Sequence, residues 1–151
     1  MGGGVEFYER MGGREGTPAF LDALKWDRDG LVAVVSQDAR SGEVLGVAFA
    51  DRTALAKTFE TGLMHYYSRS RRKLWLKGEE SGHVQKLVEL RTDCDGDAIL
   101  AKVRQVKGNC HLGFFSCFSY ALSKSRAGKW TLKSVGKKVF DPKKVYKTKK
   151  S

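Results

Sequence analysis

Cysteine is scarce in this sequence, and long apolar runs are absent. The chain has 151 residues and three cysteines, and an odd number of thiols excludes a complete disulfide framework. Its longest apolar runs, at 31–35 and 44–50, are far shorter than a membrane-spanning helix. No stretch has the pattern of a secretory signal peptide. We therefore expect a cytoplasmic protein without a membrane segment, whose cysteines are metal ligands or buried thiols.

Acidic residues are also scarce near the end of the chain. Residues 121–151 contain eleven lysines and arginines but one acid, Asp141, so they carry most of the formal net charge of +11. Such blocks of like charge are most often solvated. We interpret residues 123–151 as a basic C-terminal extension in solvent, with contact to a polyanion or a membrane surface as the alternative.

The rest of the sequence indicates one domain over residues 17–122. The glycine-rich residues 1–16 are predicted to be a flexible leader. Strands are predicted at 31–37, 44–50, 63–68, 73–78, 83–91, 97–106, 113–122 and 130–135. Because few helices interrupt these strands, we expect an α+β fold of mostly antiparallel β-sheet with one or two helices.

Two segments have the start and stop signals of helices. Thr17 as N-cap and Pro18 in the first helical position predict a short helix. Asp51 as N-cap and Gly62 as terminating residue bracket a stronger one.

The sequence DCDGD, residues 93–97, alternates two kinds of metal ligand. On a strand, Asp93, Asp95 and Asp97 would face one side and Cys94 the other. Carboxylates suit Mg²⁺ or Ca²⁺, whereas thiolates suit zinc. A fully extended strand would separate the outer aspartates by ~13 Å, too far for one small cation. The segment must therefore bend if all three aspartates bind together, and Gly96 is where we expect the bend.

An EF-hand loop does not account for this motif. Counted from Asp93, the required glycine at the sixth position is Ala98, and the required glutamate at the twelfth is Arg104. A polar surface turn or strand end without a metal remains the alternative.

The three cysteines are widely spaced, at Cys94, Cys110 and Cys117. Because no C-x-x-C pair is present, a zinc finger or ribbon is disfavoured. Three protein ligands would leave the fourth zinc position to water, as in catalytic sites. His111 is a candidate for moving protons there. The alternatives are buried thiols and a structural histidine.

A basic and aromatic stretch at residues 65–85 is the candidate substrate-binding segment. Guanidinium groups bind phosphate, hydroxyl groups complete such a site, and aromatic rings stack on bases. The candidate residues are Arg69, Ser70, Arg71, Arg72, Trp75, Lys77 and Ser81. From these residues alone, a phosphorylated small molecule, a nucleic acid and a solvated hairpin all remain open.

Taken in order, four stretches closely resemble the phosphoribosyl-AMP cyclohydrolase family of histidine biosynthesis. They are residues 31–62, 65–85, 93–105 (DCDGDAILAKVRQ) and 110–118 (CHLGFFSCF). Leu112, Phe114 and Phe115 depart from the family pattern, which commonly has threonine and basic or aromatic residues there. The resemblance does not cover the lysine-rich end.

The resemblance implies an intertwined homodimer with active sites at the subunit interface. It implies that Asp93, Asp95 and Asp97 hold Mg²⁺, and that Cys110 and Cys117 hold Zn²⁺ together with Cys94 of the partner subunit.

The function that the resemblance implies is hydrolytic opening of the adenine ring of phosphoribosyl-AMP at the bond between carbon 6 and nitrogen 1. Zinc-activated water would attack carbon 6, His111 would transfer protons, and the basic stretch would orient the phosphates. The expected substrate is a phosphorylated nucleotide, and nucleic acid is not expected beyond weak contact with the basic extension. The alternatives are a basic RNA-binding protein with a structural zinc site and an inactive cyclohydrolase-like dimer.

Overall fold

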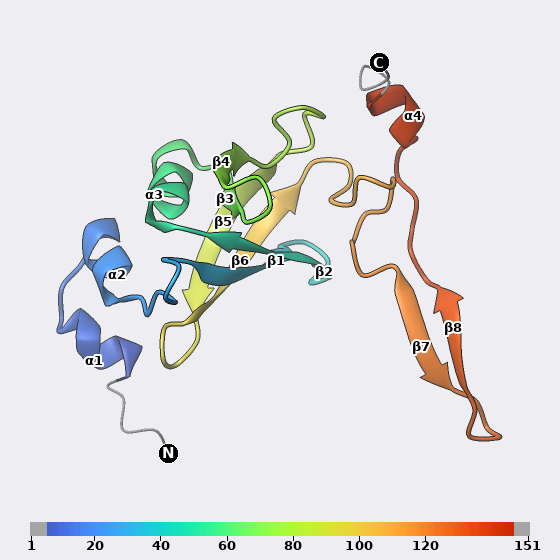
Figure 1. The fold of residues 1–151 in the computed structure, drawn as a ribbon, viewed down its shortest axis with the longest axis horizontal. Helices are drawn as coiled ribbons and strands as arrows, with labels where there is room; N and C mark the ends of the chain where they lie inside the picture. The colour runs from blue at the N-terminus through green and yellow to red at the C-terminus, as the bar shows by residue number, and fades with distance from the viewer. Residues whose placement is uncertain (1–5, 147–151) are drawn as a thin grey trace.

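The computed structural model describes residues 6–146 (Figure 1). Parts of the predicted leader, residues 1–5, and of the predicted extension, residues 147–151, lie outside the described residues. The helices are α1 (Phe7–Met11), α2 (Thr17–Ala23), α3 (Arg52–Thr61) and α4 (Pro142–Val145). The strands are β1 (Val32–Asp38), β2 (Val44–Ala50), β3 (His65–Ser68), β4 (Lys73–Leu76), β5 (Gln85–Thr92), β6 (Ala98–Gln105), β7 (Tyr120–Lys124) and β8 (Trp130–Ser134).

Four strands form the central sheet, in the order β2-β1-β6-β5. β1 pairs with β2 and β5 with β6 in antiparallel fashion, while β1 and β6 run parallel. Two antiparallel pairs, β3-β4 and β7-β8, stand beside the sheet. The predicted α+β class with mostly antiparallel sheet is confirmed.

The core lies between the sheet and the helices α2 and α3. Burial alternates along β1 with a period of two, so that Val32 and Val34 point into the core. Leu55 of α3, Met64 and Ile99 are fully buried against them. Burying each large aliphatic side chain contributes about 1.5–3 kcal/mol to folding. This packed layer fixes the ends of the strands, and the loops that form the candidate site begin at those ends.

The predicted helix boundaries at Asp51 and Gly62 are confirmed. The Asp51 side chain accepts a hydrogen bond of 2.8 Å from the backbone N–H of Ala54, a cap that typically contributes about 1 kcal/mol. Gly62 ends α3 in the left-handed conformation, with φ of 78°, which glycine adopts without steric cost. In the first predicted helix, however, the N-cap is Gly16, one residue before the predicted Thr17.

Two segments differ from their predicted structure. Residues 113–122 were predicted to be one strand, but the strand begins only at Tyr120. The preceding residues form a loop, because their hydrogen bonds go to Leu45 and to Lys137 rather than to one neighbouring strand. Within the expected flexible leader, residues 7–11 form α1, for which the glycine-rich sequence gave no signal.

The β7-β8 hairpin projects from the sheet on the opposite side from α1 and α2 (Figure 1). The chain then returns toward the loop after β6 and forms α4. Within residues 6–146, no helix is long and apolar enough to cross a membrane.

Candidate active site

The DCDGD segment is a tight turn between β5 and β6, which we call the acidic turn (residues 93–97). Gly96 has a φ of 76°, and Asp93 Oδ1 accepts hydrogen bonds from the backbone N–H groups of Gly96, Asp97 and Ala98 at 3.0, 3.1 and 3.3 Å. The predicted bend at Gly96 is therefore confirmed. The predicted alternation along an extended strand is wrong, because the Asp93 carboxylate and the glycine together fold these residues back.

The fold of the acidic turn brings its three carboxylates together. Oxygen atoms of Asp93, Asp95 and Asp97 lie within 4.8 Å of one another. Hydrogen bonds with Asp93 and Asp95, together with slight desolvation and the negative charge of those two carboxylates, raise the pKa of Asp97 from 3.8 to about 6. A set of oxygen donors with this excess of negative charge has the chemistry of a site for a hard divalent cation.

Helix α1 holds the backbone of the acidic turn from outside. The N–H of Phe7 donates to the carbonyl of Cys94 at 2.9 Å, and the Arg10 guanidinium donates to the carbonyl of Asp95 at 2.6 Å. A Cβ atom on Gly96 would lie 2.7 Å from the Arg10 side chain and 2.8 Å from the Phe7 ring. The expected leader thus contains residues that shape the candidate cation site.

The cysteines fall into two separate places. Cys94 is exposed in the acidic turn. Cys110 and Cys117 belong to the loop after the other end of β6, where the two thiols are near enough to interact electrostatically. We call Cys110 and Cys117 the thiol pair. In the described part of the chain, no third cysteine, histidine, aspartate or glutamate joins the thiol pair in a ligand group.

Asn109 holds the sulfur of Cys117 in place. Its buried amide nitrogen donates to Cys117 Sγ at 3.1 Å and to the carbonyl of Leu45 at 2.9 Å. Although Cys117 is exposed as a residue, partial desolvation of its thiol raises the pKa to about 11, and nearby Cys110 adds to this effect. Lys77 and the Asn109 hydrogen bond oppose the rise.

A buried network of polar side chains fixes the position of the Asn109 side chain. Gln85 is 1% exposed, and its amide nitrogen donates to Asn109 Oδ1 at 3.1 Å and to Gln105 Oε1 at 2.9 Å. The hydroxyl of Tyr66 donates to Gln85 Oε1 at 2.5 Å. Burial raises the pKa of Tyr66, so this hydroxyl remains a donor. Satisfied networks of this kind fix side-chain positions.

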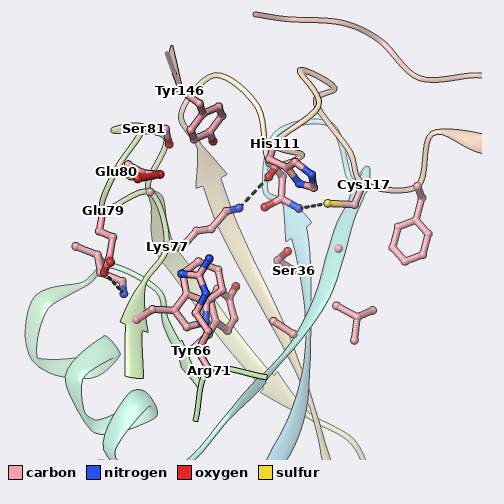
Figure 2. A pocket seen from close by; sticks show the side chains of 18 residues that line it. Ser36, Tyr66, Arg71, Lys77, Glu79, Glu80, Ser81, His111, Cys117 and Tyr146 are labelled. Carbon is pink, nitrogen blue, oxygen red and sulfur yellow. Dashed lines mark hydrogen bonds between the residues drawn. The ribbon is translucent and has the colours of Figure 1, made fainter. Parts of the chain in front are cut away.

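A cavity of 810 Å³ opens beside the thiol pair (Figure 2). Cys117 and His111 lie on one wall, and Lys77 points across the cavity from β4 and the loop after it. Lys77 Nζ donates to the carbonyl of Asn109 at 2.8 Å. Burial lowers the pKa of Lys77, while the thiols of Cys117 and Cys110 oppose this shift. A thiol, an imidazole and a cation therefore meet in one concave site.

The basic stretch contributes only part of its predicted residues to the cavity. Arg71, Trp75, Lys77 and Ser81 line it. The other three predicted residues, Arg69, Ser70 and Arg72, do not.

The positions of these three residues follow from the tight β3-β4 turn. The Arg69 guanidinium lies 3.9 Å from the centre of the Phe49 ring, and Ser70 is 3.4 Å from Ser68 Oγ. Arg72 has a φ of 53°, a left-handed backbone conformation that is uncommon for residues other than glycine. A substrate-binding role for these three residues stays a prediction.

Several cavity residues were not identified from the sequence. The only sequence signal for Asn109 is its position next to Cys110, a candidate ligand. Glu79, Glu80, Ser36 and Tyr146 also line the cavity. Nothing in the lysine-rich end distinguished Tyr146.

Gly46 on β2 leaves the space that Asn109 occupies. A Cβ atom at this position would lie 2.7 Å from Asn109 Nδ2 and 3.5 Å from Cys117 Sγ. Gly46→Ala is therefore expected to displace the amide and to weaken zinc binding by roughly 10- to 100-fold, as other losses of ligand support do. Zinc competition against a chromogenic chelator measures this. Val44→Ala, at a 40% exposed residue of the same strand, is the control, and equal zinc affinity in both variants would contradict the expectation.

Comparison with known proteins places this chain with one family. The family model described as phosphoribosyl-AMP cyclohydrolase matches residues 46–119. The chain is 53% identical over 126 residues to the phosphoribosyl-AMP cyclohydrolase of Methanococcoides burtonii, covering 83% of this chain and 98% of that protein. It is 54% identical over 129 residues to that of Azoarcus sp., covering 84% and 95%, and 50% identical over 129 residues to that of Chromobacterium violaceum, covering 85% and 94%.

Proposed function

Because this chain belongs to the phosphoribosyl-AMP cyclohydrolase family, we propose that it opens the adenine ring of phosphoribosyl-AMP by hydrolysis, in histidine biosynthesis. The bond broken joins carbon 6 to nitrogen 1. The observation that carries the proposal is the cavity in which Cys117, His111 and Lys77 converge, with Cys110 beside Cys117.

The thiol pair fits a zinc site that is completed from outside the chain. Cys110 and Cys117 supply two soft ligands, and Cys94 of the partner subunit would supply the third. Cys94 fits this role because it is exposed and lies in a different part of its own chain. When bound, zinc would act as a Lewis acid that lowers the pKa of water. The Asn109 amide keeps Cys117 directed toward the cavity.

The remaining cavity residues have complementary roles in hydrolysis. His111 lines the cavity beside Cys117 and would move protons between the attacking water and ring nitrogen 1. Lys77 and Arg71 would attract the phosphate groups of the substrate. These cations lie on the same wall as Trp75, so the phosphates and the ring system would be held together.

A second copy of the chain would also cover an apolar face that one copy leaves exposed. Leu122 lies opposite Leu132 in the β7-β8 hairpin, and Lys124 lies opposite Trp130. Side chains of opposed residues share a face, and the three apolar ones are 59–63% exposed. An isolated two-stranded hairpin is only marginally stable. We therefore propose that this face packs against a partner subunit in a homodimer.

The acidic turn fits Mg²⁺ on its oxygen donors. In the absence of a cation, the raised pKa of Asp97 means that the folded state loses stability as pH rises through about 6. Asp97→Asn is expected to remove this loss, so that the variant gains in melting temperature relative to wild type between pH 4 and pH 7. The same variant should lose most of the stabilisation that Mg²⁺ gives to wild type.

Thermal melts with EDTA and with Mg²⁺, at several pH values, measure both effects. Asp29→Asn is the control, because Asp29 is an exposed aspartate outside the carboxylate cluster. An Asp97→Asn variant that keeps the full Mg²⁺ effect would contradict the proposed site.

The test of the proposed function is a ring-opening assay on purified, zinc-loaded protein. Absorbance follows conversion of phosphoribosyl-AMP, which we expect to stop after zinc removal and to return on zinc addition. No conversion by the zinc-loaded protein would overturn the proposal. If that inactive protein bound RNA with a steep dependence on salt, the RNA-binding alternative would replace it.

A further inference from the structure

The chain after β8 runs back along the loop that carries the thiol pair. We call residues 135–146 the C-terminal strap. The N–H of Phe115 donates to the carbonyl of Lys137 at 2.9 Å, and the N–H of Val139 donates to the carbonyl of Gly113 at 2.8 Å. Phe114 and Lys138 form an isolated β-bridge. The strap is therefore paired with this loop through its backbone and is not a separate extension.

Close approach between the strap and the loop depends on two glycines. A Cβ atom on Gly113 would lie 2.6 Å from the carbonyl oxygen of Phe140, and one on Gly108 would lie 2.7 Å from a methyl group of Val139. Only glycine leaves room for such contacts. The loop on both sides of Cys110 is thus built to receive the strap.

The aromatic residues of the strap pack in a row, and the last of them, Tyr146, lines the cavity. Phe140 packs edge-to-face on the buried His83, with ring centres 4.5 Å apart. Tyr146 lies 6.5 Å from Phe140, measured between ring centres, and lines the cavity. Asp141 accepts a hydrogen bond of 3.0 Å from the N–H of Lys143 and begins α4, which carries the chain to Tyr146.

We propose that the C-terminal strap belongs to the active site and that Tyr146 forms part of the wall that binds the purine ring of the substrate. This inference rests on the proposed function. Tyr146 lies over the cavity on the side of Ser81 and His111 (Figure 2). The atoms that react are in the purine, and they must come close to His111 and Cys117. The ring system of the substrate therefore reaches this end of the cavity, where a flat aromatic side chain stacks on it.

The opposite charges of the strap and the substrate support the same arrangement. Lys143 and Lys144 lie in the last turn of α4, three and two residues before Tyr146. The substrate carries two phosphate groups, so positive charge near the mouth would attract it. The lysine-rich end thus combines an electrostatic contribution with a specific aromatic contact.

Four variants test the role of Tyr146. Tyr146→Ala is expected to raise KM for phosphoribosyl-AMP and to weaken binding of AMP by at least about fivefold, the lower limit for a lost base stack, with smaller change in kcat. Tyr146→Phe should restore both values, whereas Tyr146→Leu, which keeps apolar packing without an aromatic face, should not. Tyr8→Ala, at an 86% exposed tyrosine in α1, is the matched control.

The measurements separate this inference from the proposed function. KM and kcat come from the ring-opening assay, and AMP affinity comes from calorimetry on the same zinc-loaded protein. If wild type is active and both Tyr146→Ala and Tyr146→Leu keep the wild-type KM and AMP affinity, the inference is overturned and the function stands. If wild type binds AMP through Tyr146 but opens no ring, the proposed ring-opening function is contradicted and the role of Tyr146 in purine binding is supported. If Tyr146→Leu has the wild-type KM and AMP affinity while Tyr146→Ala does not, purine stacking by Tyr146 is contradicted, because apolar packing alone would then suffice.

Discussion

Cys110→Ser is expected to abolish zinc retention and ring opening together. Cys110 is buried and its thiol interacts with that of Cys117, and a serine hydroxyl is a poor zinc ligand compared with a thiolate. Mutating a residue that only supports a metal ligand typically lowers metal affinity or activity about 10- to 100-fold. Loss of the ligand itself should therefore lower kcat/KM by more than about 100-fold. Zinc content by atomic emission and turnover of phosphoribosyl-AMP, measured on one preparation, check both expectations.

A folding defect is the alternative explanation of such a loss, and the melting temperature addresses it. Serine is close to cysteine in size and Cys110 lies in a loop, so we expect a shift of only a few degrees relative to zinc-stripped wild type. Excess zinc should restore activity to stripped wild type but not to the variant. A Cys110→Ser protein that turns over normally would exclude the thiol pair from the reaction.

Local signals in the sequence were sufficient for the elements that frame the site. Asp51 and Gly62 mark both ends of α3 because capping depends on a few neighbouring backbone groups. The period of two along β1 follows from a sheet with one buried face. Such features are encoded within a few residues, so they do not depend on distant parts of the chain.

The acidic turn shows where local pattern is ambiguous. Aspartates at every second position suit an exposed strand, but Asp93 can also accept several backbone N–H groups and close a turn. Contacts from Phe7 and Arg10, more than eighty residues away in sequence, accompany the turn. The residue types therefore indicated a candidate cation site, while the backbone that gathers the three carboxylates was not predictable from them.

The lysine-rich end shows that net charge is a weak guide to packing. Lysines are tolerated on almost any surface, so the lysine content of this segment gives no information on the few residues that determine the path of the strap. Val139, Phe140 and Tyr146 make the contacts with the loop and the cavity. They are spaced without helical or strand period, so only a structure brings them together.

Mixing two inactive variants is expected to restore activity, because the proposed zinc site takes ligands from two subunits. In a heterodimer of Cys94→Ser and Cys117→Ser chains, one site receives an intact Cys94 from one chain and intact Cys110 and Cys117 from the other. The second site lacks both. Each homodimer has no complete site.

Random exchange of equal amounts of the two chains would make half of the dimers mixed, with one complete site of two, so activity should recover to about a quarter of wild type. Coexpression with two affinity tags isolates the mixed dimer, for which about half of wild-type activity and one zinc per dimer are expected. A mixture of Cys110→Ser and Cys117→Ser chains is the control, since those two ligands come from the same chain and no site is then complete. Recovery in the control, or none in the test pair, would show that Cys94 does not complete the thiol pair across the interface. That result would leave the exposed Cys94 without a role in zinc binding, although the acidic turn around it would keep its cation chemistry.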